Sequence, residues 1–268
     1  MATPLLILFA CSIVIGLVTT LIVVVTVSVD NWAYVTYDGN KLMAINDSCR
    51  AQGAVPCHLV QISEAPPMYR FDTYMNSYLK NTSSFIYSTE SGLWSTCDSL
   101  TDDLRVIYLK NMASNFKGKK CFTFVTDYNE DSDVLTLSSG AKQIARLQNS
   151  AASCYIVVLI DLSSAAVVGL IGLVQKQVAS CMVTGVLYLM AALFGVFGLS
   201  MFHTKEYYEK NFCYALDEIP SKLCDARVVS IGYAVPLAWL GVVTCSLSCF
   251  VWLCVSRALR VIRAKTML

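Results

Sequence analysis

Residues 5–29, LLILFACSIVIGLVTTLIVVVTVSV, form an apolar run without one charged side chain. A helix needs roughly 20 residues to cross the hydrocarbon of a bilayer, and a segment in lipid must satisfy its backbone hydrogen bonds internally. A cleaved signal peptide is the alternative, but it has a basic start and an apolar core of about 7–15 residues. The run has neither property, so it predicts a retained transmembrane helix.

Three further runs have the same character, at residues 151–174, 178–202 and 228–255. Asp161 is the only ionisable acidic or basic side chain in them. The whole chain is 56% hydrophobic and 15% charged, whereas soluble domains carry about 25% charged residues. The sequence therefore predicts a membrane protein with four spanning helices.

Basic residues predict the orientation of the spans. The short segments 1–4, 175–177 and 256–268 contain no acidic residue and share five basic ones: Lys176, Arg257, Arg260, Arg263 and Lys265. Short loops enriched in Lys and Arg stay in the cytoplasm. We expect a multi-pass plasma-membrane protein with both termini in the cytoplasm and with extracellular loops at residues 30–150 and 203–227.

Cysteine usage and glycosylation motifs agree with that orientation. The predicted outer loops hold six of the twelve cysteines: Cys49, Cys57, Cys97, Cys121, Cys213 and Cys224. An even number in an oxidising compartment indicates a disulfide framework, for which six cysteines allow 15 pairings. Proximity in the sequence favours Cys49 with Cys57 and Cys213 with Cys224. Asn46 and Asn81 begin two N-glycosylation motifs, both in the predicted outer loop.

The first outer loop is too long to lack structure, and its pattern predicts a sheet. Aromatic and β-branched residues favour strands at 32–37, 84–88, 92–94 and 121–126. Residues 38–40, Asp-Gly-Asn, predict a turn, and residues 104–112 a short helix. We expect this sheet to be stable because it packs on the ends of the spans.

A small set of residues in this loop resembles a known family pattern. A tryptophan follows the first span, a Gly-Leu-Trp motif precedes one cysteine and then another, and Gln-Ile-Ala-Arg at 143–146 precedes the second span. The residues concerned are Trp32, Gly92, Leu93, Trp94, Cys97, Cys121 and Arg146. Together with the four spans they resemble the superfamily of claudins, peripheral myelin proteins and stargazin-like calcium-channel gamma subunits. The resemblance implies an all-α membrane four-helix bundle with an extracellular antiparallel β-sheet, and a Cys97–Cys121 disulfide.

The departures from that pattern guide the functional prediction. The gaps from Trp32 to Gly92 and from Cys97 to Cys121 are longer than in typical claudins. Enlarged glycosylated loops look more like the gamma-subunit and claudin-domain-containing branches than like barrier-forming claudins. We therefore expect a non-enzymatic protein that organises partner membrane proteins as an auxiliary subunit of a channel or receptor complex, with synapses among its possible locations. The alternative is a claudin-like adhesion or junction protein that contacts claudin-like proteins on the same or a facing cell. A pore or transporter is disfavoured because its path would need more intramembrane polar groups.

Two other features carry expectations about single sites. A charged group at mid-membrane costs at least ~2.5 kcal/mol, so we expect Asp161 to hydrogen-bond within the bundle, with Ser12, Thr19, Thr20 or Thr184 as partners. The last residues, Thr266, Met267 and Leu268, fit the C-terminal pattern that PDZ scaffolds bind. The sequence contains no catalytic, metal-binding, cofactor-binding or nucleic-acid-binding motif.

Overall fold

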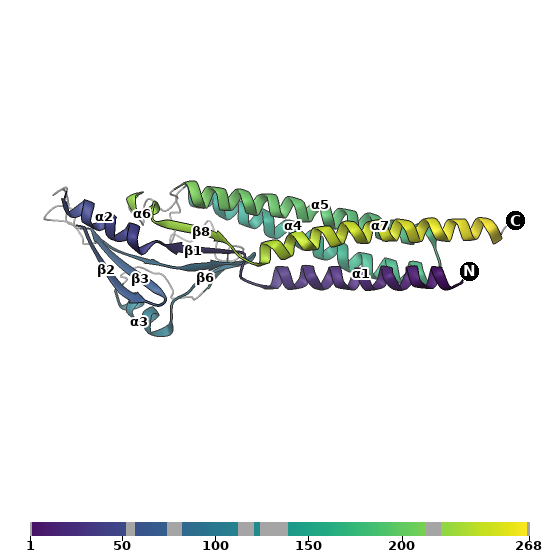
Figure 1. Cartoon of the computed structure of the whole chain (residues 1–268), viewed down its shortest axis with the longest axis horizontal. Helices are drawn as coiled ribbons and strands as arrows, with labels where there is room; N and C mark the ends of the chain where they lie inside the picture. The colour runs from purple at the N-terminus through teal and green to yellow at the C-terminus, as the bar shows by residue number, and fades with distance from the viewer. Residues whose placement is uncertain are drawn as a thin grey trace, which may run out of the picture. The chain divides into compact units, whose positions relative to one another are not determined.

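The computed structural model describes residues 2–51, 57–73, 82–111, 121–123, 139–212 and 221–266. The chain divides into two compact units. The helix unit comprises Met1–Val29, Ser150–His203 and Tyr233–Leu268, and the loop unit comprises Asp30–Asn149 and Thr204–Gly232. Figure 1 labels the elements of both.

Four long helices confirm the predicted spans. They are α1 (Ala2–Ser28), α4 (Ser139–Val174), α5 (Val178–Asn211) and α7 (Ala234–Thr266), and each is long and apolar enough to cross a membrane. Figure 1 shows the N-terminus of α1 and the C-terminus of α7 at the same end of the helix unit. The protein is therefore a multi-pass membrane protein with a four-helix bundle.

Small residues allow these helices to approach closely. A Cβ atom at Gly169 of α4 would lie 2.9 Å from the Trp252 ring of α7, and one at Gly195 of α5 would lie 2.9 Å from Val242 of α7. A buried hydrogen bond of 3.1 Å joins the hydroxyls of Thr19 on α1 and Ser248 on α7. Close backbone approach and hydroxyl bonds are the usual means of helix association in lipid, where burial of apolar surface provides no driving force.

The described residues of the loop unit form two antiparallel sheets. The larger has the strand order β7-β6-β5-β1-β8, from β1 (Ala33–Tyr37), β5 (Thr89–Ser91), β6 (Ser95–Asp98), β7 (Cys121–Thr123) and β8 (Arg227–Ile231). The smaller has the order β2-β3-β4, from β2 (Cys57–Glu64), β3 (Pro67–Thr73) and β4 (Thr82–Tyr87). Three helices accompany them: α2 (Gly39–Ala51), α3 (Asp102–Asn111) and α6 (Ser221–Cys224). Four apolar helices with small antiparallel sheets are the fold class that the sequence predicts.

Two apolar clusters stabilise the smaller sheet. Leu42 of α2 packs with Leu59, Tyr69 and Ile86 from the three strands and with Leu223 of α6. A second cluster joins three buried residues from β3, β4 and the segment before α3: Met68, Phe85 and Leu100. Burying a large apolar side chain contributes roughly 1.5–3 kcal/mol, so these clusters supply the packing that a small sheet requires.

Three local predictions were wrong. Residues 92–94 form the connection between β5 and β6 rather than a strand. The predicted turn at 38–40 is the start of α2, because the Asp38 carboxylate accepts a 3.0 Å hydrogen bond from the Asn40 backbone N–H and caps the helix. Residues 228–231, assigned to the fourth span, belong to β8, because Val228 and Val229 pair with Thr36 and Val35 of β1.

The helices also extend beyond the predicted spans. α4 begins at Ser139 rather than near residue 151, and α5 continues to Asn211 rather than ending near 202. These extra turns belong to the loop unit. They supply side chains to the site described next.

Candidate functional site around the Gly92–Trp94 loop

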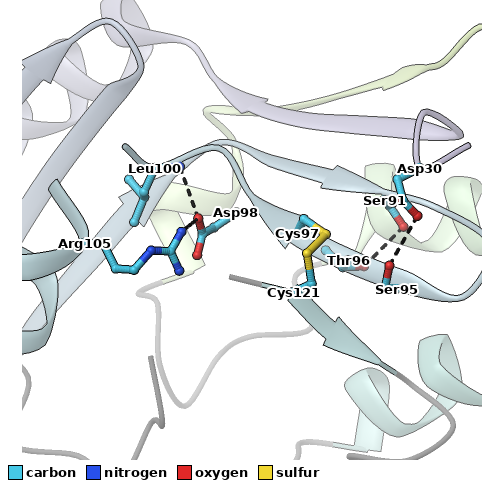
Figure 2. The surroundings of a disulfide bond; sticks show 9 residues. All are labelled: Asp30, Ser91, Ser95, Thr96, Cys97, Asp98, Leu100, Arg105 and Cys121. Carbon is cyan, nitrogen blue, oxygen red and sulfur yellow. Dashed lines mark hydrogen bonds and ion pairs between the residues drawn. A yellow bond between two sulfur atoms is a disulfide. The ribbon is translucent and has the colours of Figure 1, made fainter. Parts of the chain in front are cut away.

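Gly92 lies where the backbone of the β5–β6 connection passes very close to another segment. A Cβ atom at this position would lie 2.9 Å from the Cα atom of Asp30, which is backbone and cannot rotate away. The Gly92 N–H donates a 2.8 Å hydrogen bond to the Ser95 carbonyl, and the Ser95 hydroxyl donates to the Asp30 carboxylate over 3.3 Å (Figure 2). A glycine is required at this position because any side chain would collide with the backbone of Asp30.

Trp32 and Leu93 are the buried apolar residues of the motif. Neither has measurable exposure to solvent, whereas Trp94 is half-buried. The Trp32 backbone N–H donates to the Ser91 carbonyl over 2.9 Å, and the Trp32 carbonyl accepts from the Gly232 N–H over 2.8 Å. Trp32 therefore anchors the start of β1 between β5 and the end of β8.

Gln148, in the early part of α4, hydrogen-bonds to the backbone of the Gly92–Trp94 loop. Its Nε2 atom donates to the carbonyl oxygens of Gly92, at 2.8 Å, and Leu93, at 2.6 Å. Gln148 is buried. Buried carbonyl groups need partners, and one amide group satisfies two of them in a connection that has no ladder hydrogen bonds of its own.

Lys205, near the end of α5, is buried beside the same connection. Its Nζ atom donates a 2.9 Å hydrogen bond to the Ser91 hydroxyl and lies 3.5 Å from Oε1 of Glu209. Lys205 is 1% exposed and Glu209 6%. A buried charge is tolerated only when it is paired and hydrogen-bonded, and one helical turn separates this pair.

Cys97 of β6 and Cys121 of β7 form a disulfide. The two residues are direct partners in the strand register, and Figure 2 shows the bond between the two strands. At the end of β6, the Asp98 carboxylate accepts a hydrogen bond from Arg105 of α3 and a 3.2 Å hydrogen bond from the Leu100 backbone N–H. The disulfide and the Arg105–Asp98 ion pair therefore both stabilise the part of the larger sheet formed by β6 and β7.

Replacing Cys97 with serine is expected to destabilise the protein. The disulfide closes a loop with a sequence separation of 24, for which the chain-entropy relation gives about 3.5 kcal/mol. Thermal unfolding of the purified full-length protein in detergent would measure the effect, and the reducing agent dithiothreitol should abolish the difference from wild type. Cys154→Ser is the matched control because Cys154 is a free cysteine. Equal unfolding temperatures for Cys97→Ser and wild type would contradict the prediction.

The other predicted disulfide cysteines are only partly described. Cys224 is disulfide-bonded, but its predicted partner Cys213 lies outside the described residues. The side chains of Cys49 and Cys57 also lie outside them, so that pairing stays a prediction. Among the cysteines whose side chains the structure describes, six are free, and these lie in the long helices: Cys11, Cys154, Cys181, Cys245, Cys249 and Cys254.

The other sequence-predicted sites are Asn46, Asn81, Arg146 and the three C-terminal residues. Asn46 lies on α2, where its side-chain oxygen accepts a 3.1 Å hydrogen bond from the Leu59 backbone N–H; Asn81 lies outside the described residues. Arg146 is exposed on α4. The Thr266 side chain, Met267 and Leu268 lie outside the described residues.

Asp161 lies in α4, but the expected hydrogen bonds to it are not formed. Its Oδ2 atom is buried and has no hydrogen-bond partner within the described residues. Ser12, Thr20 and Thr184 donate instead to carbonyl groups of their own helices, and Thr19 pairs with Ser248. Hydroxyls in helices commonly bond to the preceding turn, which leaves none of these four for the carboxylate.

Tyr37, at the end of β1, is the described loop-unit residue whose pKa is clearly perturbed. Burial against the Leu42 cluster raises the pKa of its phenol above the ordinary value, and the nearby Arg227 guanidinium opposes this by favouring the anion. Arg227 is its register partner on β8. The phenol therefore stays protonated and neutral under physiological conditions.

The polar side chains of the site fix the backbone of the Gly92–Trp94 loop. The polar groups around the loop hydrogen-bond to each other and to backbone carbonyls, and no three metal-ligating side chains gather among the described residues. Sequence reasoning missed Gln148 and Lys205. For Lys205 the sequence did offer an indication, because Lys205 and Glu209 are four residues apart and such residues are neighbours on one face of a helix.

Comparison with known proteins identifies the family to which the chain belongs. The family model described as PMP-22/EMP/MP20/Claudin tight junction matches residues 17–254. No curated protein matches the chain significantly. The match extends from the first helix through the loop unit into the last helix, so that it covers both the spans and the Gly92–Trp94 loop. The chain belongs to the PMP-22/EMP/MP20/claudin family of four-span membrane proteins.

Proposed function

We propose that this chain is a non-enzymatic plasma-membrane protein that binds and organises other membrane proteins, as an auxiliary subunit of an ion channel or receptor complex. Family membership supports interaction with membrane proteins in general. The observation that carries the proposal is an apolar surface along β8, which is the last strand of the larger sheet among the described residues. We call it the β8 surface and define it by Tyr207, Tyr208, Phe212, Val228 and Ile231.

The aromatic part of the β8 surface lies at the end of α5. The ring of Phe212 lies 6.4 Å from that of Tyr207 and 5.3 Å from that of Tyr208, and the Tyr207 and Tyr208 rings are 6.1 Å apart. Tyr207 is 60% exposed and Phe212 54%. Large aromatic groups that stay exposed in water are enriched at protein interfaces, where they provide most of the binding energy.

The strand part of the surface adjoins the aromatic part. β8 pairs with β1 on one side and is the last strand of its sheet. Val228 and Ile231 are exposed on it, one on each face of the strand. Arg227 connects the two parts, because its guanidinium donates a 3.1 Å hydrogen bond to the Phe212 carbonyl. An edge strand with exposed apolar side chains presents a template for another chain to bind.

The test compares two variants in full-length protein on living cells. Tyr207→Ser combined with Phe212→Ser is expected to reduce the proteins that co-purify after crosslinking within one membrane. Val106→Ser, which alters an exposed apolar residue of α3, is the matched control and should leave them unchanged. Equal recovery of the same proteins with both variants would contradict a role for the β8 surface.

Cell mixing separates this function from claudin-like adhesion, the second candidate. If the protein becomes enriched at cell contacts only when both neighbouring cells express it, adhesion is supported. Recovery of a stable complex from one membrane, without that enrichment, supports the auxiliary subunit. A PDZ scaffold that binds Thr266, Met267 and Leu268 is part of either proposal, and deletion of these residues would test it in the same purification.

The proposed orientation places both termini in the cytoplasm and the loop unit outside the cell. Its support is the basic end of the helix unit, where Arg263 donates a 2.9 Å hydrogen bond to the carbonyl of Lys176 in the α4–α5 link. Basic residues collect on the cytoplasmic side, and a disulfide in the loop unit fits the oxidising exterior.

Glycan mapping checks this orientation. Asn46→Gln and Asn81→Gln are each expected to remove one glycan, seen as a step in electrophoretic mobility that peptide N-glycosidase abolishes in wild type. A gel that shows no glycan on either asparagine, together with labelling of the loop unit from the cytosolic side only, would contradict it.

A further inference from the structure

Asp161 lies near the middle of the membrane-spanning part of α4. It is 11 residues from Ser150 and 13 from Val174, which corresponds to about 16 Å and about 20 Å along a helix. The hydrocarbon of a bilayer is about 30 Å thick. Neither end of the span lies close enough for a short aspartate side chain to reach water.

The helix unit does not provide a partner for this carboxylate. Its Oδ2 atom is buried without a hydrogen bond in the described part of the chain, and the four hydroxyls expected as partners bond elsewhere. The apolar runs of all four spans contain no lysine or arginine. A second copy of this chain therefore has no intramembrane cation to offer, and a cationic partner must come from a different protein.

The surroundings of Asp161 form a stripe that a neighbouring helix can contact. Val157, Asp161, Ser164 and Val168 follow one another at spacings of four, three and four residues, the spacing of the contact seam between two packed helices. All four are half-buried in the bundle. The small side chain of Ser164, one turn from Asp161, permits close approach of a helix backbone. We call these four residues the Asp161 stripe.

We propose that the Asp161 stripe binds a transmembrane helix of another protein that carries a lysine or arginine at mid-membrane depth. This inference rests on the proposed function, because it adds an intramembrane contact to a protein that organises membrane partners. Ionisable residues inside membranes pair with one another across helices, and an unpaired carboxylate selects a cation over an apolar surface. The β8 surface and the Asp161 stripe then act on the same partner class through two separate contacts.

The experiment uses a polyleucine helix with one lysine at its centre as the probe, co-expressed with the full-length chain and detected by resonance energy transfer. We expect about tenfold stronger association than with an all-leucine probe, loss of that difference in Asp161→Asn, and a decline when the lysine is moved two turns along the probe. Ser164→Leu should weaken the association because it blocks helix approach. Ser163→Leu, on the exposed side of α4, is the matched control and should not.

Three results would overturn the inference. The first is equal association of lysine and leucine probes with wild type. The second is equal association of the lysine probe and of a further probe that carries glutamine in place of the lysine, which would mean that a protonated Asp161 makes only neutral hydrogen bonds. The third is an equal effect of Ser163→Leu and Ser164→Leu. Thermal unfolding of Asp161→Asn in detergent should match or exceed that of wild type, which separates lost binding from lost folding.

The same cells distinguish failure of this inference from failure of the proposed function. If only the inference fails, the β8-dependent complexes persist in Asp161→Asn and the lysine probe does not bind. If only the proposed function fails, the lysine probe still binds in an Asp161-dependent manner, although no complex depends on Tyr207 and Phe212.

Discussion

Replacing Lys205 with alanine is expected to destabilise the protein by about 3–5 kcal/mol, because the change leaves the Glu209 carboxylate buried without its cation. Lys205 also donates to the Ser91 hydroxyl, which lies at the end of β5 beside Gly92. Its loss should therefore loosen the Gly92–Trp94 loop as well as the end of α5. Thermal unfolding of the full-length protein in detergent would measure the loss.

Lys210→Ala is the matched control, since Lys210 is an exposed lysine of the same helix. Exposed substitutions of this kind usually change stability by less than about 0.5 kcal/mol. A variant that replaces both partners, Lys205→Met with Glu209→Leu, should recover much of the lost stability, because an apolar pair of similar size needs no charge compensation. Should the double variant be as unstable as Lys205→Ala alone, the ion pair is not the cause.

Replacing Trp32 with alanine is expected to cost a similar amount, about 3–5 kcal/mol, through loss of buried area and formation of a cavity. Trp32 is fully buried, and its backbone lies between Ser91 and Gly232. The cavity would adjoin β1, which has β5 on one side and β8 on the other. We therefore also expect greater protease sensitivity in the loop unit.

Trp94→Ala provides the comparison for Trp32→Ala, because Trp94 is half-buried in the same unit. Its cost should be clearly smaller, since less area is withdrawn from water. Limited proteolysis and thermal unfolding of both variants would check the order. If Trp94→Ala lowered the stability of the protein as much as Trp32→Ala or more, the prediction that the more buried tryptophan contributes more to stability would be wrong.

Several features could be predicted from local sequence because they depend on local physics. A long apolar run must be helical in lipid, so the cores of α1, α4, α5 and α7 were predictable. The aromatic and β-branched residues at 33–37 are sufficient to indicate β1. These signals need no information about distant residues.

Other features were ambiguous because one local pattern fits two structures. Aspartate favours both turns and helix N-caps, so Asp38 alone does not distinguish a turn from the start of α2. Val228 and Val229 suit a membrane helix as well as a strand. Their pairing with β1, nearly two hundred residues earlier in the chain, places them in strand β8. A local hydropathy pattern contains no information about such a distant pairing.

The sequence by itself determined four spans and a structured first loop, because composition and spacing carry that information, while the Cys97–Cys121 disulfide followed from the family resemblance. Only the tertiary structure decided that Gln148 and Lys205 hold the Gly92–Trp94 loop, and that Asp161 finds no partner among the hydroxyls of its own bundle. The physical reason is that a polar side chain in a protein interior is defined by which donors and acceptors reach it, and those come from helices and strands far apart in the chain.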